Sequence, residues 1–440
     1  MIGMNRRKFL AASAVFATCS LVLATVPAQA FSPRYEVGVT ASTIKLGITL
    51  PMSGAASPGY KKIPGGMKAY FDYVNANGGV YGRKITLVVK DDAYTPTASV
   101  QKTNELILKD KVFALVGALG TANNKAVAAS VSPARRGIPD LFVNTGFSGF
   151  ADKKAYPTTF SLFPSYVMEA KIMAQYIKET YPGKKLGLLY QADDFGSDAL
   201  AGFKTAGLNF DVKVPYAPLS QAVAGTSATW ISKLAAGGAQ VVVLFGVSSA
   251  TAAALYAAYV GKFKAQWILG SVGGDATTII ESGVPPALLN GVQTASFLPA
   301  PSDTTDEYVK LFQDINAKYN TASAKDKEFD NNILAGMNTA FITVQAIAAA
   351  GKNLTRRGLI SAIEKKGTTL ASAGLAPMAV SSTSHAGYTG YWFGTYDATA
   401  TIKPNGGVYT VYTTDSGKGA VVKSTYKRPP MPAQGLPTNK

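Results

Sequence analysis

The stretch Val112–Ser132, which reads VFALVGALGTANNKAVAASVS, decides the fold. Its first part, Phe113–Val116, is an apolar run typical of a buried parallel strand. Gly117 and Gly120 allow the backbone to turn sharply, and Thr121 stands where a helix should begin. Such a unit directs free N–H groups and the positive end of a helix dipole at one point, where a small acidic or carbonyl-bearing ligand could bind. An ordinary strand-to-helix turn with Thr121 as N-cap is the alternative interpretation.

Strands and helices alternate on both sides of this stretch. Before it, Thr43–Leu50 and Ile85–Lys90 are predicted strands. The segments of about Ile63–Asn77 and Pro96–Lys109 are predicted helices. The pattern starts again after Phe160–Pro164. Apolar strands that alternate with helices predict an α/β fold with parallel sheets covered on both faces, and 440 residues are enough for two lobes.

The N-terminus has the three parts of a secretory signal. Arg6-Arg7-Lys8 precede the apolar run Phe9–Leu23, and a small-residue cleavage site ends at Ala30. We therefore expect residues 1–30 to be a cleaved signal peptide and the mature protein to be periplasmic or otherwise extracytoplasmic. The basic residues fit a twin-arginine signal and a generic basic region equally well. Cys19 lies in the apolar run behind a poor lipobox, so the mature chain is expected to be free of lipid, disulfides and thiol chemistry.

The net charge of the chain is +17, or +14 without the three basic signal residues. Lys and Arg are spread along the chain without a dense basic run, so no nucleic-acid partner is expected. An exported protein that meets an anionic membrane surface would explain the charge. The uncharged stretch Val241–Gly261 divides into a strand, Val241–Phe245, and a helix from Ser249 onward, so we do not expect a second membrane span.

The sequence gives little support to catalysis. His385, the only histidine, lies in a predicted loop and is expected to be structural. A mature chain without cysteine has no Cys/His metal site, and we expect no metal or cofactor. Asp91-Asp92 and Asp193-Asp194 could be the paired acids of a glycoside hydrolase, but they more simply end strands or cap helices. A cleft hydrolase is the enzyme alternative to a binding protein.

Several short motifs occur together along the mature chain. They are Ile44-Lys45-Leu46-Gly47-Ile48, Pro51-Met52-Ser53-Gly54, the block from Asn77 to Ile85 that reads NGGVYGRKI, Val116-Gly117, Gly137-Ile138-Pro139, Phe195-Gly196 and His385-Ala386-Gly387. With these motifs the sequence resembles the leucine/isoleucine/valine-binding family of periplasmic substrate-binding proteins of ABC transporters. The resemblance covers nearly the whole mature chain, and the Asn-Gly-Gly-x-x-Gly-Arg block is its most specific part.

The resemblance implies the type I periplasmic binding protein fold, in which two doubly wound parallel-sheet lobes are joined by a hinge of three crossings. The first lobe is expected to comprise residues 41–162 and 299–350, and the second 163–298 and 351–425. The crossings are expected near Phe160–Ser165, Thr294–Pro301 and within Tyr388–Thr395. Residues 426–440 form a Pro-rich tail that we expect to be loosely ordered.

The resemblance also implies a function. A monomeric extracytoplasmic protein would capture a small molecule, an amino acid or a related carboxylate or amide, in the cleft between the lobes. It would deliver this ligand to the permease subunits of an ABC transporter. The alternative is a sensor component that presents the ligand to a membrane receptor.

The family's ligand contacts can be transferred to single residues of this chain. Thr121, beside Ala122, matches the hydroxyl that holds the ligand carboxylate. Asn144, beside Thr145, matches a carbonyl that accepts from the ammonium group. The remaining expected ligand-binding residues are an aromatic residue that packs over the ligand, two aromatic wall positions and an acid that is a candidate to neutralise the ammonium group: Phe195, Tyr60, Phe329 and Asp275.

Two positions depart from the family. Gly146 stands where a threonine hydroxyl often binds the ammonium group, and Val272 stands near the position of the family's neutralising carboxylate. A buried ammonium group without these partners would cost several kcal/mol. The pocket could therefore take an aromatic or aliphatic acid, an amide or another small polar metabolite instead of an α-amino acid.

Overall fold

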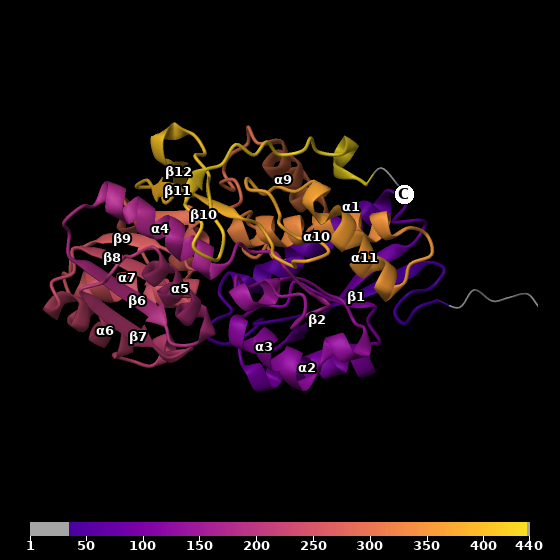
Figure 1. Ribbon diagram of the computed structural model, residues 1–440, viewed down its shortest axis with the longest axis horizontal. Helices are drawn as coiled ribbons and strands as arrows, with labels where there is room; N and C mark the ends of the chain where they lie inside the picture. Colours follow the sequence, from indigo (N-terminus) through magenta and orange to yellow (C-terminus); the bar gives the residue numbers. More distant parts are fainter. Residues whose placement is uncertain (1–34, 438–440) are drawn as a thin grey trace, which may run out of the picture. The chain divides into compact units, whose positions relative to one another are not determined.

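The computed structural model describes residues 35–437, so the expected signal peptide over residues 1–30 lies outside the described residues. The described chain forms two sheets, each flanked by helices (Figure 1). We call the first sheet with its helices lobe 1 and the second lobe 2. The chain leaves lobe 1 after β5, returns after β10 and passes to lobe 2 again before β11.

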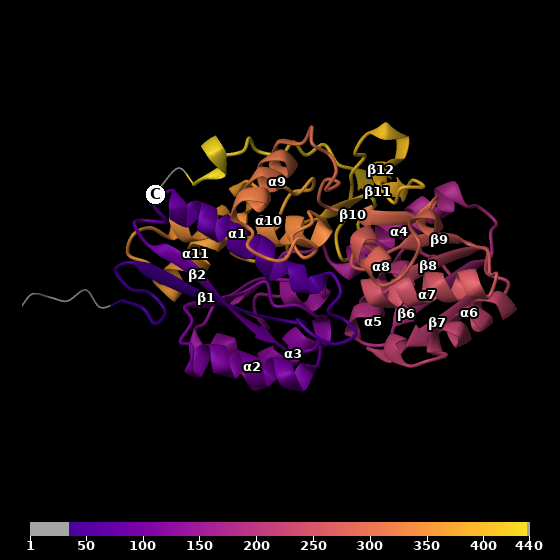
Figure 2. The same ribbon diagram turned by 180° about the vertical axis from the view of Figure 1, so that it is seen from behind.

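The five strands of the first sheet are all parallel, in the order β2-β1-β3-β4-β5. They are β1 (Thr43–Leu50), β2 (Lys84–Asp91), β3 (Ala114–Val116), β4 (Asp140–Val143) and β5 (Thr159–Ser161). The helices of this lobe are α1 (Ile63–Ala76), α2 (Pro96–Leu108), α3 (Thr121–Ser130), α9 (Glu307–Tyr319) and α10 (Asn331–Ala350), and α11 (Arg356–Lys366) follows α10 in the chain. Figures 1 and 2 show α2 and α3 on one face of the sheet, with α1 and α10 on the other.

The second sheet is larger, with the order β14-β13-β11-β10-β9-β8-β6-β7 and β12 beside β11. The parallel strands are β6 (Leu186–Gln191), β7 (Val212–Tyr216), β8 (Val241–Phe245), β9 (Gln266–Leu269) and β10 (Gln293–Ser296). An antiparallel part follows, formed by β11 (Gly390–Tyr396), β12 (Ile402–Pro404), β13 (Tyr412–Thr413) and β14 (Val422–Lys423). The helices are α4 (Tyr166–Thr180), α5 (Asp194–Thr205), α6 (Thr226–Ala236), α7 (Ser248–Val260) and α8 (Ala276–Glu281).

The stretch 241–261 folds as β8 and α7, as the sequence predicts. Among the described residues, one helix, α10, is long and apolar enough to cross a membrane. Most side chains of α10 are buried inside the protein, where it packs against α1. A helix that is apolar nearly all round is what such a central position requires.

Helix α11 falls in the range 351–425 that the sequence assigns to lobe 2. Its contacts lie elsewhere: the Arg356 guanidinium donates to the carbonyl oxygens of Phe113 and Val112 at 2.8 and 2.9 Å, beside β3. Helix α11 also packs against α10. We therefore propose that α11 belongs to lobe 1 and that the chain enters lobe 2 for the second time only after it.

The C-terminal segment 427–437 is not loose, which corrects the expectation from its composition. Arg428 forms an ion pair with Asp306 at 2.5 Å, and Arg428 also donates to the carbonyl of Ala373 at 3.0 Å. Tyr70 of α1 donates to the carbonyl of Gly435 at 2.5 Å. Since β14 precedes this segment in the second sheet, these bonds lead the chain back to lobe 1.

Candidate functional site

The turn between β3 and α3 has the geometry that its sequence suggests. Gly117 and Gly120 have φ values of 66° and 104°, a region that favours glycine. Gly120 is the N-cap residue of α3, and no side chain caps this end. The alternative in which Thr121 caps the helix is therefore wrong. The Thr121 hydroxyl instead lies 2.7 Å from the hydroxyl of Thr145, at the end of β4.

The first amides of α3 have no acceptor within the helix, because intrahelical bonds begin with Asn124, which donates to the carbonyl of Gly120 at 3.0 Å. The N–H groups of Thr121, Ala122 and Asn123 therefore make the start of α3 a site that favours negative charge or a carbonyl oxygen. The Thr121 side chain is buried beside them.

Both lobes contribute to a small cavity at Thr121. Tyr60, Tyr94, Leu119, Gly120, Thr121 and Asn144 line it from lobe 1, and Tyr166, Phe195, Val247 and Val272 complete it. Its volume is about 10 Å³, too little for more than a single water. Four aromatic side chains are part of its lining, those of Tyr60, Tyr94, Tyr166 and Phe195, so a molecule larger than a water could enter only if the lobes or these side chains moved.

Tyr166 explains why residue 146 is glycine. A side chain at Gly146 would meet the carbonyl oxygen of Pro164 at 2.6 Å and the ring of Tyr166 at 2.8 Å. The Tyr166 ring lies 4.4 Å from the ring of Phe195, centroid to centroid. Tyr166, which packs on Phe195, thus takes the space that a side chain at position 146 would need. Burial raises the pKa of Tyr166 well above its usual range, so its hydroxyl stays protonated.

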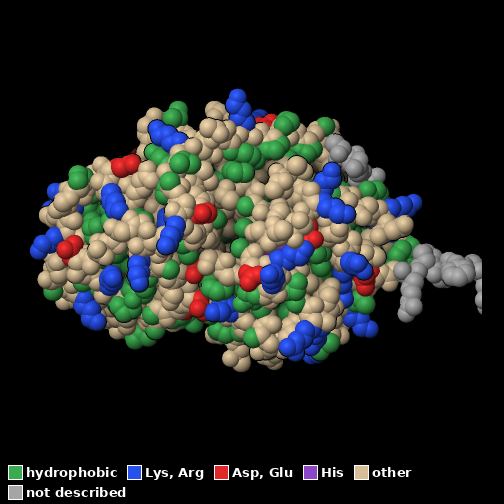
Figure 3. Space-filling view, viewed as in Figure 1, with side chains coloured by type: hydrophobic (Ala, Val, Ile, Leu, Met, Phe, Trp, Pro, Cys, Tyr) green, Lys and Arg blue, Asp and Glu red, His purple; other side chains and the backbone are tan. Residues whose placement is uncertain are grey.

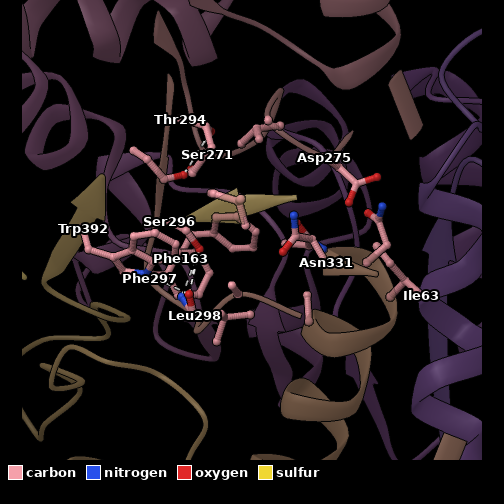
Figure 4. Close-up of a pocket in the computed structure, with 18 of the residues that line it drawn as sticks. Ile63, Phe163, Ser271, Asp275, Thr294, Ser296, Phe297, Leu298, Asn331 and Trp392 are labelled. Atoms are coloured by element: carbon pink, nitrogen blue, oxygen red, sulfur yellow. Dashed lines mark hydrogen bonds between the residues drawn. The ribbon is translucent and has the colours of Figure 1, made fainter. Parts of the chain in front are cut away.

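A second cavity of about 70 Å³ adjoins the first on the side of the crossings (Figure 4). The two cavities share Tyr60, Asn144 and Val272, and the Tyr60 hydroxyl donates to the carbonyl of Val272 at 3.3 Å. The walls of the second cavity combine apolar and amide or hydroxyl side chains, among them Phe163, Phe297, Trp392, Asn331, Asn332 and Thr294.

Asp275 lines this second cavity and caps helix α8. Its Oδ1 accepts from the backbone N–H of Thr278 at 2.7 Å and from the Thr278 hydroxyl at 2.5 Å. Burial raises the pKa of Asp275 above its ordinary value. The carboxyl group thus has a structural role at α8 in addition to its place on the cavity wall.

The structure brings Tyr60, Thr121, Asn144 and Phe195 together at the first cavity and adds Asp275 at the second. The side chains of the other three expected residues, Ala122, Thr145 and Phe329, line neither cavity, although Thr145 supports Thr121. The sequence reasoning missed Tyr94 and Tyr166. Both follow the carboxyl end of a strand of lobe 1, β2 or β5, and that position is a signal for the cleft of a parallel sheet.

Charged contacts join the two lobes beside the cavities. Lys62 of lobe 1 is fully buried, and its Nζ lies 2.9 Å from Glu281 of α8 and 3.0 Å from Asp330 of lobe 1. Burial alone would lower the pKa of Lys62, but the two carboxylates raise it. A more exposed pair, Lys125 and Asp194, joins α3 to α5 at 2.7 Å.

Two of the residues weighed above for catalysis, His385 and Asp193, have structural roles. His385 is buried, stacks on Phe160, and places its ring nitrogens 2.9 Å from the carbonyl of Thr159 and 3.2 Å from Glu364. Asp193 caps α5, as the simpler interpretation of the paired acids predicts. Within residues 35–437, no group of three or more His, Cys, Asp or Glu side chains is placed to hold a metal ion.

A family model described as "Periplasmic binding protein" matches residues 43–401. The chain belongs to this family. The Leu/Ile/Val-binding protein homolog 7 of Brucella suis is 25% identical over 293 residues, which are 61% of this chain and 71% of the relative. An amino acid binding protein of Pseudomonas aeruginosa is 29% identical over 208 residues, 46% of this chain and 54% of that protein. These relatives confirm the resemblance seen in the sequence.

Solved structures confirm the type I fold. A fatty acid ABC transporter substrate-binding protein from Thermomonospora curvata superposes with a TM-score of 0.74 at 23% identity, over 90% of this chain and 97% of the other. A branched-chain amino acid ABC transporter protein from Thermus thermophilus with bound valine gives a TM-score of 0.73 at 18% identity, over 86% and 98%. The family match and these superpositions together show that the chain is a periplasmic binding protein with this fold.

Proposed function

We propose that this periplasmic binding protein captures a small carboxylate or amide between its lobes and delivers it to the permease subunits of an ABC transporter. The observation that carries the proposal is the place of Thr121. Thr121 is the first residue of α3, and it lines one cavity together with aromatic side chains that include Phe195 of lobe 2. A ligand held there would touch both lobes and favour the form in which they are closed.

The walls of the cleft favour particular ligand groups. Among residues 35–437, no charged side chain lines the cavity at Thr121, so a carboxylate there would be held by hydroxyl and amide donors. Gly146 and Val272 offer no counter-charge to an α-ammonium group, and Asp275 lies only in the adjoining cavity. We therefore favour an acid or amide with an aromatic or aliphatic body over an α-amino acid. The alternative, a sensor that presents its ligand to a receptor, would use the same site.

Native mass spectrometry of the purified protein should identify the bound small molecule, and Thr121→Ala should then weaken its binding. We expect a loss of about 1–3 kcal/mol, because a charge-assisted hydrogen bond to the ligand is removed. Isothermal titration calorimetry measures this loss. The matched control is Thr226→Ala, which changes the first residue of α6, outside both cavities. Equal affinities of the wild type and Thr121→Ala would remove Thr121 from the site.

We also propose that the protein is exported and cleaved after Ala30. The basic residues, the apolar run and the small-residue site of the N-terminus support this, and the family is one of extracytoplasmic proteins. N-terminal sequencing of the exported protein should begin at Phe31. A mature chain that begins at a lipid-modified Cys19 would contradict the proposal.

A further inference from the structure

The charges of lobe 2 are separated between the two edges of its parallel strands. At the carboxyl edge, which faces the cleft, lie Asp193, Asp194 and Asp275. At the opposite edge the strands begin and the flanking helices end, because helices and strands run antiparallel in such a lobe. The exposed lysines gather at this second edge.

We define the basic edge of lobe 2 by seven lysines, all exposed: Lys178, Lys184, Lys185, Lys204, Lys233, Lys262 and Lys264. Hydrogen bonds order the strand starts that carry it. The side chain of Gln240 accepts from the N–H of Lys185 at 3.1 Å, and its carbonyl accepts from the N–H of Gln266 at 2.9 Å. Lys178 donates to the carbonyl of Ala206 at the end of α5, at 2.5 Å.

Few acids offset this charge. Glu179 follows Lys178, and Asp211 precedes β7 with its carboxylate accepting from the N–H of Leu186 at 2.7 Å. Asp397 follows β11. Figure 3 shows one side of this lobe, at the left, with several lysine side chains and few acidic ones.

Exposed apolar side chains stand next to the basic edge. Tyr256, Tyr259 and Val260, in the last two turns of α7, are 52%, 60% and 62% exposed. Helix α7 lies at the surface that faces the viewer in Figure 2. A groove of about 510 Å³ follows, lined by Tyr259, Lys262, Phe263, Lys264, Trp267 and Leu288 among others.

Lysines in the last turn of a helix offset the negative end of its dipole, which accounts for Lys178, Lys204 and Lys233. Lys262 directly follows the C-cap of α7, but Lys264 lies beyond the reach of the dipole, and both lysines line the open groove beside the exposed Tyr259. Tyrosine, tryptophan and lysine are the residues that proteins place at the level of lipid headgroups.

We propose that the basic edge of lobe 2, with the end of α7, binds the anionic headgroups of a membrane surface. The lysines supply the opposite charge, and Tyr256, Tyr259 and Val260 enter the headgroup layer. The inference rests on the extracytoplasmic location of the family and not on the identity of the ligand. Attachment of this kind would restrict the diffusion of the protein to the membrane surface, near its membrane partners.

Sedimentation with vesicles tests the proposal on the mature protein. Vesicles of phosphatidylglycerol and phosphatidylcholine should bind the protein at low salt, and binding should weaken at high salt. Vesicles of phosphatidylcholine alone should bind it at least about tenfold more weakly. The double change Lys262→Glu/Lys264→Glu should lower the partition coefficient on anionic vesicles by at least about tenfold.

The matched control is Lys365→Glu/Lys366→Glu, which makes the same change of charge at the end of α11 in lobe 1. It should retain most of the binding. Thermal melts establish that each variant folds. The double change Tyr256→Ser/Tyr259→Ser is a second test that leaves the charge unchanged, and it should also weaken binding to anionic vesicles. Three results would overturn the proposal. They are no binding to anionic vesicles, an equal loss of vesicle binding in the two lysine double variants, and occupation of the basic edge by a second copy of the chain in place of lipid.

Discussion

Replacing Lys62 with methionine will lower the free energy of unfolding by about 3–5 kcal/mol near neutral pH. The Lys62 ammonium group is fully buried between Asp330 and Glu281. Methionine fills similar space but leaves these carboxylates without their cation, and Asp275 adds further negative charge nearby. Burial and the Asp275 charge raise the pKa of Asp330 while Lys62 lowers it, so removal of the Lys62 cation disfavours the charged carboxylate further.

Chemical denaturation at neutral pH measures the loss, and the neighbouring residue provides the control. Lys61 pairs with Asp326 at 2.8 Å, but their side chains are 35% and 32% exposed. Lys61→Met should therefore cost only about 0–1 kcal/mol. If the two variants lose the same stability, Lys62 is not held in the buried network described above.

The second large effect concerns Asp140, the first residue of β4. It is buried, and its Oδ1 has no hydrogen-bond partner. Burial raises the pKa of Asp140 to about 7, against an ordinary value near 4. Between these values the folded chain holds a proton that the unfolded chain releases. The contribution of Asp140 to stability is therefore present below about pH 4 and is lost as the pH rises to about 7.

Asp140→Asn removes this titration. The unfolding free energy of the variant minus that of the wild type should therefore increase by on the order of 2–4 kcal/mol when the pH is raised from 4.5 to 8.5. Urea titrations of both proteins at the two pH values measure the gain, and comparison across pH cancels any change in packing that does not depend on pH. A stability difference that stays constant with pH would show that Asp140 does not titrate in this range.

The sequence was sufficient for the fold because each strand and helix has its own periodicity. The strand Thr43–Leu50 was predicted to the residue, and β8 and α7 were separated correctly within an uncharged stretch. The C-terminal segment was wrongly expected to be loosely ordered, because its proline content indicates only the local stiffness of the backbone and not its contacts with the rest of the protein. The bonds of Arg428 and Gly435 depend on partners far away in the chain.

The site was predictable only in part, for a similar reason. Thr121 could be found because its helix start is encoded locally by Gly117 and Gly120. The cavity at Thr121 also depends on Tyr94 and Tyr166, which reach it from separate loops. Asp275 was recognised as a candidate, but its hydrogen bonds to Thr278 at the start of α8 were not foreseen.

The return of residues 427–437 to lobe 1 affects how the two lobes can move. Two lobes joined by a single flexible segment can translate and rotate relative to each other. Each further segment that passes between them removes some of these degrees of freedom, and residues 427–437 add one more such passage. We therefore expect the lobes to be restricted to fewer relative arrangements before a ligand binds. If a ligand closes the lobes, less rotational entropy would then be lost, and a larger share of the contact energy would be retained as affinity.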